Sequence, residues 1–392
     1  MSETGLWGPQ LDFSTLPANP EIATHEWAER CGYWRKSLSE NAPKRKRRER
    51  QDRPMILAGH GISISVDKGT LLIRDGNTHY PDPKTPLRYF KGDLNLPPRI
   101  VLVDGSGAIT LDAIDWLTAQ KVDLIRLDWQ GHIVTVASAT GYAADPKKVA
   151  WQFATRSNEP KRVSFAIPLI RTKIEQTLFN LREILPPSRY RDSAIENASD
   201  ALRVLKSNPP RTVSKLAAIE GVVAQGYFYA WRALDMKWKA VSRYPIPDDW
   251  KQYLSRSTLN TKTRVRNKRA THPINAMLNY AYGVLEASTR IQVIAEGYDP
   301  TIGIMHDSLK PEKHSFVHDR MEPMRPVADR TILKLIKEQT FSGADFVLQK
   351  DGVCRLNPEM ARNLVADMSL LSGRRVDFLG WVAKLEIQNK ED

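Results

Sequence analysis

The chain has 392 residues, 41% of them hydrophobic and 26% charged, and its 58 Lys and Arg against 45 Asp and Glu leave a formal net charge of +13. This length predicts two domains and a tail, and no stretch approaches the roughly 18 apolar residues that a membrane span needs. We expect a cytoplasmic protein with no membrane segment. Its charge favours a polyanionic partner, nucleic acid first, over the alternative of a merely basic soluble protein.

The N-terminus lacks a basic-then-apolar signal pattern, so no targeting segment is expected. The two cysteines, Cys31 and Cys354, lie far apart in the sequence and have no spacing typical of zinc ligands or of a disulfide framework. Structural zinc and redox chemistry are therefore not expected.

Residues 1–53 show no sustained hydrophobic period and end in the run Lys44-Arg45-Lys46-Arg47-Arg48-Glu49-Arg50. Like charges this close repel one another and resist packing. We expect a basic, mobile N-terminal extension. It either contacts phosphates without sequence preference or is a solvated tail.

Residues 54–140 have the pattern of a small β-rich domain. Ile62, Ile64 and Val66 alternate with polar residues, as a strand with one buried face requires. Asp67-Lys68-Gly69 and Asp75-Gly76-Asn77 are typical of hairpin turns. One short helix is expected around residues 111–117.

Residues 141–375 have apolar residues at spacings of three and four, which predicts an α-helical domain, and residues 376–392 form a C-terminal tail. Strands followed by helices in separate blocks favour two separate domains over a doubly wound sheet. The predicted fold class is α+β: a small N-terminal β-rich domain followed by a larger all-α domain.

Glu220 lies in a predicted helix that Thr212 or Ser214 caps. It falls on the apolar stripe of that helix. The stripe consists of Leu216, Val223, Tyr227 and Trp231. A carboxylate that faces a core is costly unless a metal, a hydrogen-bond network or a cation compensates it. Glu220 is therefore either a metal ligand or the partner of a neighbouring arginine, and the helix pattern leaves both open.

A second helix, about residues 273–296, begins after Thr271 and stops at Gly297. It brings Asn275, Asn279 and Tyr282 close to one face, where they either position a ligand or phosphate or bond to adjacent helices.

If residues 316–322 form a helix, Asp319 and Glu322 share one face. With the nearby His306 they suggest a hard-metal site, because carboxylate oxygens with one imidazole suit Mg²⁺ or Mn²⁺ better than zinc.

Four segments, in this order, resemble the catalytic domain of the CRISPR-associated integrase family, the larger subunit of the spacer-acquisition (adaptation) complex. They are IEGVVAQGYF, HPINAMLNYAYGVLEA, GYDPTIGIMH and SFVHDRMEPMRP with the following Val327-Ala-Asp329. With the β-rich region included, the resemblance covers residues 54–375. It implies a β domain used for dimerisation and partner contact and a helical catalytic domain.

The resemblance implies that Glu220, His306 and Glu322 bind Mg²⁺ or Mn²⁺, with Asp319 as the adjacent catalytic acid. Position 318 is His where the family commonly has Tyr. Position 322 is Glu where many members have Asp, which keeps a carboxylate.

Asn275 and Tyr282 match family positions close to the site and would position the scissile phosphate or the attacking end. The run before them is basic and would bind DNA, although an exposed charged loop is the alternative. It contains Lys262, Arg264, Arg266, Lys268 and Arg269.

The function implied by the resemblance is an endonuclease or integrase that joins the 3′-hydroxyl ends of short DNA duplexes to a repeat array by transesterification, without ATP. A homodimer with a small ferredoxin-like partner protein is implied. Two alternatives remain: a transposon-associated integrase or structure-specific nuclease of the same family, and a noncatalytic DNA-binding scaffold.

Overall fold

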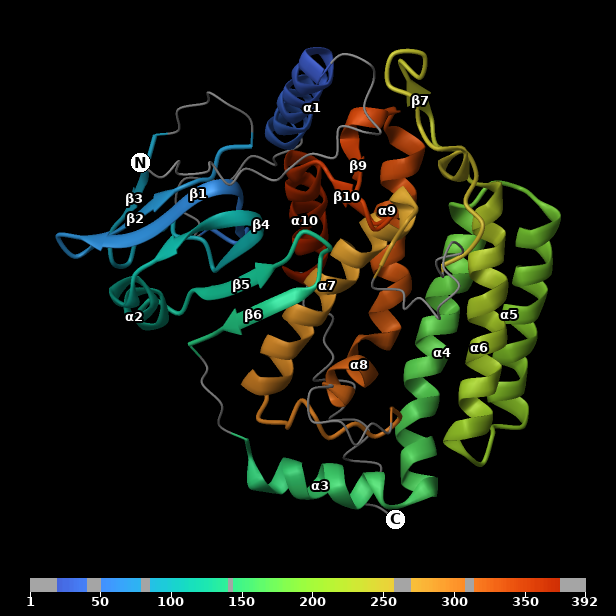
Figure 1. Cartoon of the computed structure of the whole chain (residues 1–392). Helices are drawn as coiled ribbons and strands as arrows, with labels where there is room; N and C mark the ends of the chain where they lie inside the picture. Colours follow the sequence, from blue (N-terminus) through green and yellow to red (C-terminus); the bar gives the residue numbers. More distant parts are fainter. Residues whose placement is uncertain are drawn as a thin grey trace.

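The computed structural model describes residues 20–40, 51–78, 85–139, 144–256, 269–306 and 314–373. Figure 1 shows a sheet on one side of the molecule and an array of helices on the other. Within these ranges, no helix is long and apolar enough to cross a membrane.

The N-terminal half forms a six-stranded mixed sheet in the order β3-β2-β1-β4-β5-β6. Its strands are β1 (Met55–Asp67), β2 (Thr70–Arg74), β3 (Leu87–Tyr89), β4 (Arg99–Ile109), β5 (Asp123–Leu127) and β6 (Ile133–Ala137). The pairs β1–β4 and β4–β5 are parallel, and the other three pairs are antiparallel. A β-rich region within residues 54–140 was therefore predicted correctly.

The two predicted turns have different outcomes. Lys68 and Gly69 both have positive φ, 49° and 77°, and join β1 to β2 in a tight hairpin, as predicted. Residues 75–77 are not a hairpin turn, because Asn77 runs on beside β1 and forms an antiparallel bridge with His60.

The helices follow mainly after the sheet. They are α1 (Pro20–Glu40), α2 (Leu111–Ala119), α3 (Pro146–Arg156), α4 (Glu159–Glu183), α5 (Arg189–Ser207), α6 (Val213–Ala230), α7 (Pro273–Ala295), α8 (Ser315–Met321), α9 (Arg325–Glu338) and α10 (Pro358–Gly373). The 3-10 turns in the described part of the chain are η2 (Trp231–Ala233), η3 (Asp248–Trp250), η4 (Glu322–Met324) and η5 (Gly343–Asp345). The expected short helix near residue 111 is confirmed as α2.

The helical half also contains four short strands. They are β7 (Trp238–Lys239), β8 (Phe341–Ser342), β9 (Phe346–Leu348) and β10 (Cys354–Leu356). β7 pairs with β8 in parallel, and β9 pairs with β10 antiparallel. The prediction of an all-α second domain is therefore wrong in detail. Strands of two or three residues are too short to produce an alternating pattern in the sequence between strongly periodic helices.

The sheet and the helices share one core, although they were predicted as two separate domains. Ile62 and Ile64 pack with α2 on one face of the sheet. On the other face, Val101 and Ile125 pack in the same cluster as buried residues of α7 and α10. Both faces of the central strands are thus apolar, as strands covered by helices on both sides require, and the sheet buttresses the helices.

Two glycines allow direct backbone contact between the sheet and α7. Gly131 precedes β6 with φ 83°, and a Cβ there would lie 2.6 Å from the backbone of Tyr280. A Cβ on Gly283 would lie 1.9 Å from the carbonyl oxygen of Gly131. Any side chain at either position would force the two elements apart. Glycine therefore fixes the depth at which the sheet edge meets the helix that carries Tyr282.

The N-terminal helix α1 packs against α10 and corrects the prediction of a mobile extension. Arg30 Nε and Trp34 Nε1 both donate to Oδ1 of Asp345, each at 2.7 Å, and all three side chains are buried. Cys31 is also buried. The helical period of residues 20–40 was missed because the buried face of this helix includes the charged side chains of Glu26 and Arg30. The basic run at residues 44–50 lies outside the described residues.

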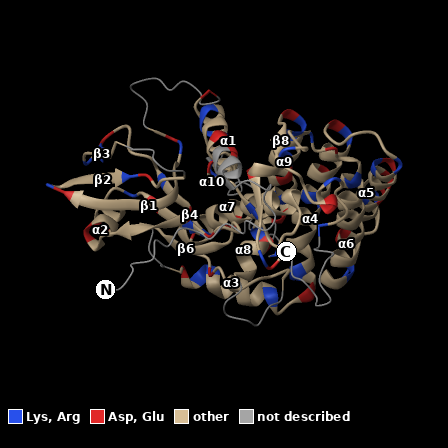
Figure 2. Ribbon diagram, turned by 45° about the horizontal axis from the view of Figure 1, so that its top comes forward, with Lys and Arg blue, Asp and Glu red and all other residues tan. Residues whose placement is uncertain are grey.

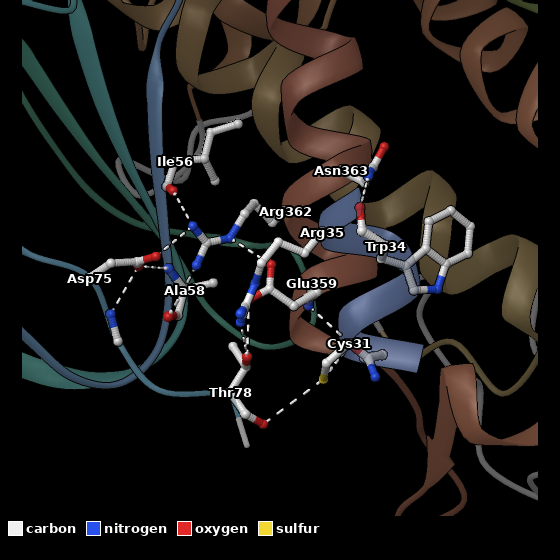
Figure 3. A network of polar contacts seen from close by, with 12 residues as sticks. Cys31, Trp34, Arg35, Ile56, Ala58, Asp75, Thr78, Glu359, Arg362 and Asn363 are labelled. Carbon is white, nitrogen blue, oxygen red and sulfur yellow. Dashed lines mark hydrogen bonds and ion pairs between the residues drawn. The ribbon is translucent and has the colours of Figure 1, made fainter. Parts of the chain in front are cut away.

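A polar network ties α1, α10 and the sheet together, as Figure 3 shows. The buried carboxylate of Glu359 accepts hydrogen bonds from Arg35 of α1 and from Thr78, both at 3.0 Å. Arg362, one turn further along α10, pairs with Asp75 at 2.6 Å and donates to the carbonyl of Ile56. The sheet and the helices are therefore joined by charge as well as by apolar packing.

The buried pair between Arg30 and Asp345 generates a prediction about stability. Arg30→Met should lower the free energy of unfolding by about 3 kcal/mol, because it leaves a buried carboxylate without its charge partner. Lys36→Met on the same helix removes an exposed cation and should change the free energy of unfolding by less than about 0.5 kcal/mol. Urea denaturation of both variants measures this. Equal stability of the two would mean that α1 is not part of the folded unit.

Candidate active site

A cleft of about 620 Å³ opens between the helices beyond the sheet. Its lining residues come mainly from α4, α6, α7, η4 and α9 and from residues 131–133 at the sheet edge. Five of the candidate ligand and positioning residues identified in the sequence line it: Glu220, Asn279, Tyr282, His306 and Glu322. The structure thus brings together side chains from three well-separated segments of the chain.

Glu220 and Glu322 are joined through a lysine that the sequence reasoning did not identify. Nζ of Lys173, on α4, lies 2.5 Å from Oε1 of Glu220 and 2.5 Å from Oε2 of Glu322. The ammonium of Lys173 thus compensates the charge of Glu220. This allows the carboxylate to lie on the apolar side of α6 and face the cleft. The expected neighbouring arginine is in fact a lysine on another helix.

The two glutamates fit a divalent ion better than the full set of three predicted ligands does. Among the described residues, no three His, Cys, Asp or Glu side chains lie close enough to hold a metal ion as they stand. Glu220 and Glu322, however, already bind one cation between their oxygens. Carboxylate oxygens are the ligands that Mg²⁺ and Mn²⁺ prefer. The donor set fits such an ion, while His306 would have to move closer to share it.

Glu322 is ionised in this setting. Burial alone would raise its pKa, but Arg325 and Lys173 outweigh burial and lower the pKa to about 2. Nε of Arg325 donates to Oε1 of Glu322 at 2.8 Å, so each carboxylate oxygen has a cationic partner. The carboxylate is therefore charged at every pH at which the protein is expected to work.

Asp319 does not face the cleft as the helix spacing suggested. Its fully buried carboxylate accepts the backbone N–H groups of residues 304, 305 and 306 and bonds Nδ1 of His306 at 2.7 Å. This arrangement turns Nε2 of His306 outward as the nitrogen for a ligand. Burial lowers the pKa of His306, but the bond and charge of Asp319 outweigh it and raise the pKa. Asp319 thus holds the His306 ring and does not itself line the cleft, and its role as the adjacent catalytic acid stays a prediction.

The half-buried Tyr282 and the buried Asp329 form a hydrogen-bonded pair on the cleft wall. The hydroxyl of Tyr282 donates to Oδ1 of Asp329 at 2.6 Å. Burial raises the pKa of Asp329 to about 6, against the lowering effect of that hydrogen bond and of Arg256. The guanidinium groups of Arg256 and Arg325 lie 5.4 Å and 5.2 Å from the Tyr282 ring centroid. The ring therefore lies between two cations.

Asn275 is not among the residues that line the cleft, and its predicted role in positioning the scissile phosphate stays a prediction. Its buried side chain accepts from the hydroxyl of Tyr253 and donates to the carbonyl of Ser255, so it braces that loop. One turn further on, Asn279 lines the cleft and accepts a hydrogen bond from Arg256 at 2.9 Å. The predicted helix face thus contributes Asn279 and Tyr282 to the cleft lining.

The predicted DNA-binding run is only partly visible. Lys262, Arg264, Arg266 and Lys268 lie outside the described residues. Arg269 is exposed and pairs with Asp351 at 2.5 Å, away from the cleft lining. Lys and Arg are interspersed with Asp and Glu on many elements in Figure 2. The role of this run in binding DNA stays a prediction.

The comparisons with known proteins identify the family. Residues 55–369 match the family described as CRISPR associated protein Cas1. The match covers most of the chain, so the protein belongs to this family. The resemblance read from the four motifs is thereby confirmed.

Relatives and solved structures agree with this assignment. The chain is 24% identical to the CRISPR-associated endonuclease Cas1 2 of Pyrobaculum aerophilum over 287 residues, 72% of this chain and 83% of that one. A casposase bound to integration product matches with a TM-score of 0.62 and 23% identity over 82% of each chain. A Cas6-RT-Cas1–Cas2 complex matches with a TM-score of 0.59 and 18% identity, over 84% of this chain and 33% of the other. The two structural matches show the fold.

The raised pKa of Asp329 predicts an effect of pH on stability. Because the folded pKa of about 6 exceeds the ordinary value of 3.8, the protonated form favours folding below pH 3.8, and this contribution is lost as pH rises through 6. The neutral variant Asp329→Asn should therefore be more stable than the wild type by about 2 kcal/mol at pH 7.5. The difference should shrink towards pH 4. Urea denaturation at both pH values measures it, and equal destabilisation at both would contradict it.

Proposed function

We propose that this protein is a metal-dependent DNA integrase and endonuclease of CRISPR adaptation. It joins the 3′-hydroxyl ends of short DNA duplexes to a repeat array by transesterification, with Mg²⁺ or Mn²⁺ bound by Glu220, Glu322 and His306. The observation that carries the proposal is the convergence of these three side chains on one cleft in a chain of the Cas1 family.

The chemistry of the cleft suits a phosphodiester. Arg256 and Arg325 line it and are permanently charged, so they are suited to neutralise a bridging phosphate. A bound divalent ion supplies further charge neutralisation at the phosphate and lowers the pKa of the attacking hydroxyl. Since one phosphodiester replaces another, the reaction needs no nucleotide triphosphate.

The residues around the ligands have positioning roles. Asp319 holds the His306 ring through Nδ1 and so keeps Nε2 available. Asp329 holds the Tyr282 hydroxyl, which fixes the ring beside Arg256 and Arg325. His318 also lines the cleft; burial lowers its pKa to about 4, so it is neutral at pH 7 and adds no charge to the site.

Two joining events require two active sites, so we propose a homodimer bridged by a small ferredoxin-like partner protein. A similar solved structure, a complex named for Cas1 and Cas2, supports assembly with a second protein, and the casposase bound to integration product supports DNA as a ligand. DNA is the proposed substrate, as fragment and as target.

Because the fold is similar to that of a casposase, one alternative function is an integrase that serves a mobile element. The chemistry would be the same and the target different. A plasmid bearing CRISPR repeats and a plasmid bearing terminal inverted repeats therefore distinguish the two as joining targets. Preferred joining to the second plasmid would favour the alternative.

The direct test is a plasmid-joining assay with the full chain, the small partner, a short duplex with free 3′ ends and Mn²⁺. We expect joined product, and a loss of about 100-fold or more in Glu220→Gln, because one ligand charge is removed from the metal site. Glu175→Gln makes the same chemical change at an exposed position of α4 outside the cleft lining and should join normally.

DNA binding by Glu220→Gln should remain close to wild type in a filter-binding assay. A protein that binds DNA but never joins it, with or without the substitution, would instead be the noncatalytic scaffold. Unchanged joining in Glu220→Gln would remove Glu220 from the site.

A further inference from the structure

Lys173 has no task in the proposed reaction, yet it occupies the centre of the site. Its ammonium lies 2.5 Å from one oxygen each of Glu220 and Glu322. We propose that Lys173 is an internal counter-cation: it holds the two carboxylates together in the metal-free protein, and a divalent ion must displace it in order to bind. The inference rests on the proposed function, since it assigns these carboxylates to a metal ion.

The gap between the carboxylates accommodates one cation. Because each oxygen lies 2.5 Å from Nζ of Lys173, the two oxygens are at most about 5 Å apart. An ion bound to both at about 2.0–2.1 Å would hold them at most about 4 Å apart. A small inward movement of the two side chains therefore suffices for metal binding. An ammonium and a divalent ion in the same gap would repel each other as like charges.

The cleft needs a positive charge at this point when no metal is bound. The side chains of Glu322 and Lys173 are only 6% and 15% exposed. Carboxylates outnumber cations among the described residues of the lining. The carboxylates belong to Glu220, Glu286, Glu322 and Asp329, and the cations to Lys173, Arg256 and Arg325. Without Lys173, two buried or half-buried carboxylates would face each other, which is costly.

The displaced side chain has a place to go. Lys173 lies on α4 between the buried residues Ile170 and Ile174, which fix its backbone, whereas its four-carbon stem has several rotatable bonds. Lys173 lines the same cleft as Arg256 and Arg325. Displacement therefore moves the ammonium towards the space in which a phosphodiester would lie, and the charge stays available to the DNA backbone.

The test measures metal affinity rather than joining. Full-length protein is freed of metal with EDTA, dialysed, and titrated with MnCl₂ by isothermal titration calorimetry. Lys173→Met should bind Mn²⁺ about tenfold or more tightly than the wild type, because the wild type must first break the lysine bridge. Lys173→Arg keeps the competing charge and should not show this gain. Arg171→Met removes an exposed cation from the same helix and should bind like the wild type.

Thermal denaturation provides a second readout. Metal-free Lys173→Met should melt at a lower temperature than the metal-free wild type, and Mn²⁺ should raise its melting temperature by more than it raises that of the wild type. If Lys173→Met does not fold, Lys173→Gln keeps a hydrogen-bonding group without the charge and is expected to behave in the same way.

The outcomes separate this inference from the proposed function. In one outcome, the wild type binds Mn²⁺ in a way that depends on Glu220, but neither Lys173→Met nor Lys173→Gln binds it more tightly. This outcome overturns the role of Lys173 and leaves the metal site intact. Absence of Glu220-dependent Mn²⁺ binding in all variants overturns both. Equal gains in Lys173→Met and Arg171→Met would show a general effect of net charge and also overturn the inference.

Discussion

The pairing of two carboxylates from different helices with one ammonium is the interaction on which the cleft depends. Lys173 on α4 holds Glu220 of α6 and Glu322 of η4 at 2.5 Å each. Arg325 satisfies the second oxygen of Glu322, so the buried charges are compensated within the site. The elements α4, α6 and η4, which are distant in sequence, are thereby held together around the cleft. The same constraint leaves a pair of oxygen ligands already arranged around a cation.

The rest of the fold supports this arrangement from outside. The sheet edge meets α7 through direct backbone contact at Gly131 and Gly283, which sets the height of Tyr282 in the cleft wall. Helix α1 and the buried Asp345 then tie the N-terminal segment to the last helices of the chain. An apparently detached N-terminal stretch is thus part of the scaffold. The site is therefore held by both halves of the molecule, which share one apolar core.

The sequence predicted what depends on local period and local chemistry. The β-rich region, the hairpin at Gly69 and the helices that carry Glu220 and Tyr282 all follow from spacing and turn residues. Lys173 could not be assigned in this way, because its partners lie 47 and 149 positions away. Its one local signal is that it borders the buried stripe of Ile170 and Ile174. Helix spacing also could not show that the carboxylate of Asp319 turns towards the backbone of residues 304–306.

The most direct test of the metal site is the position of a bound ion in crystals of the protein grown with Mn²⁺ and measured for anomalous scattering. We expect one peak within about 2.3 Å of an oxygen of Glu220 and an oxygen of Glu322, with Nε2 of His306 turned towards it and the ammonium of Lys173 withdrawn into the cleft. An ion bound elsewhere, with Lys173 still bridging the two glutamates, would contradict the assignment of this site.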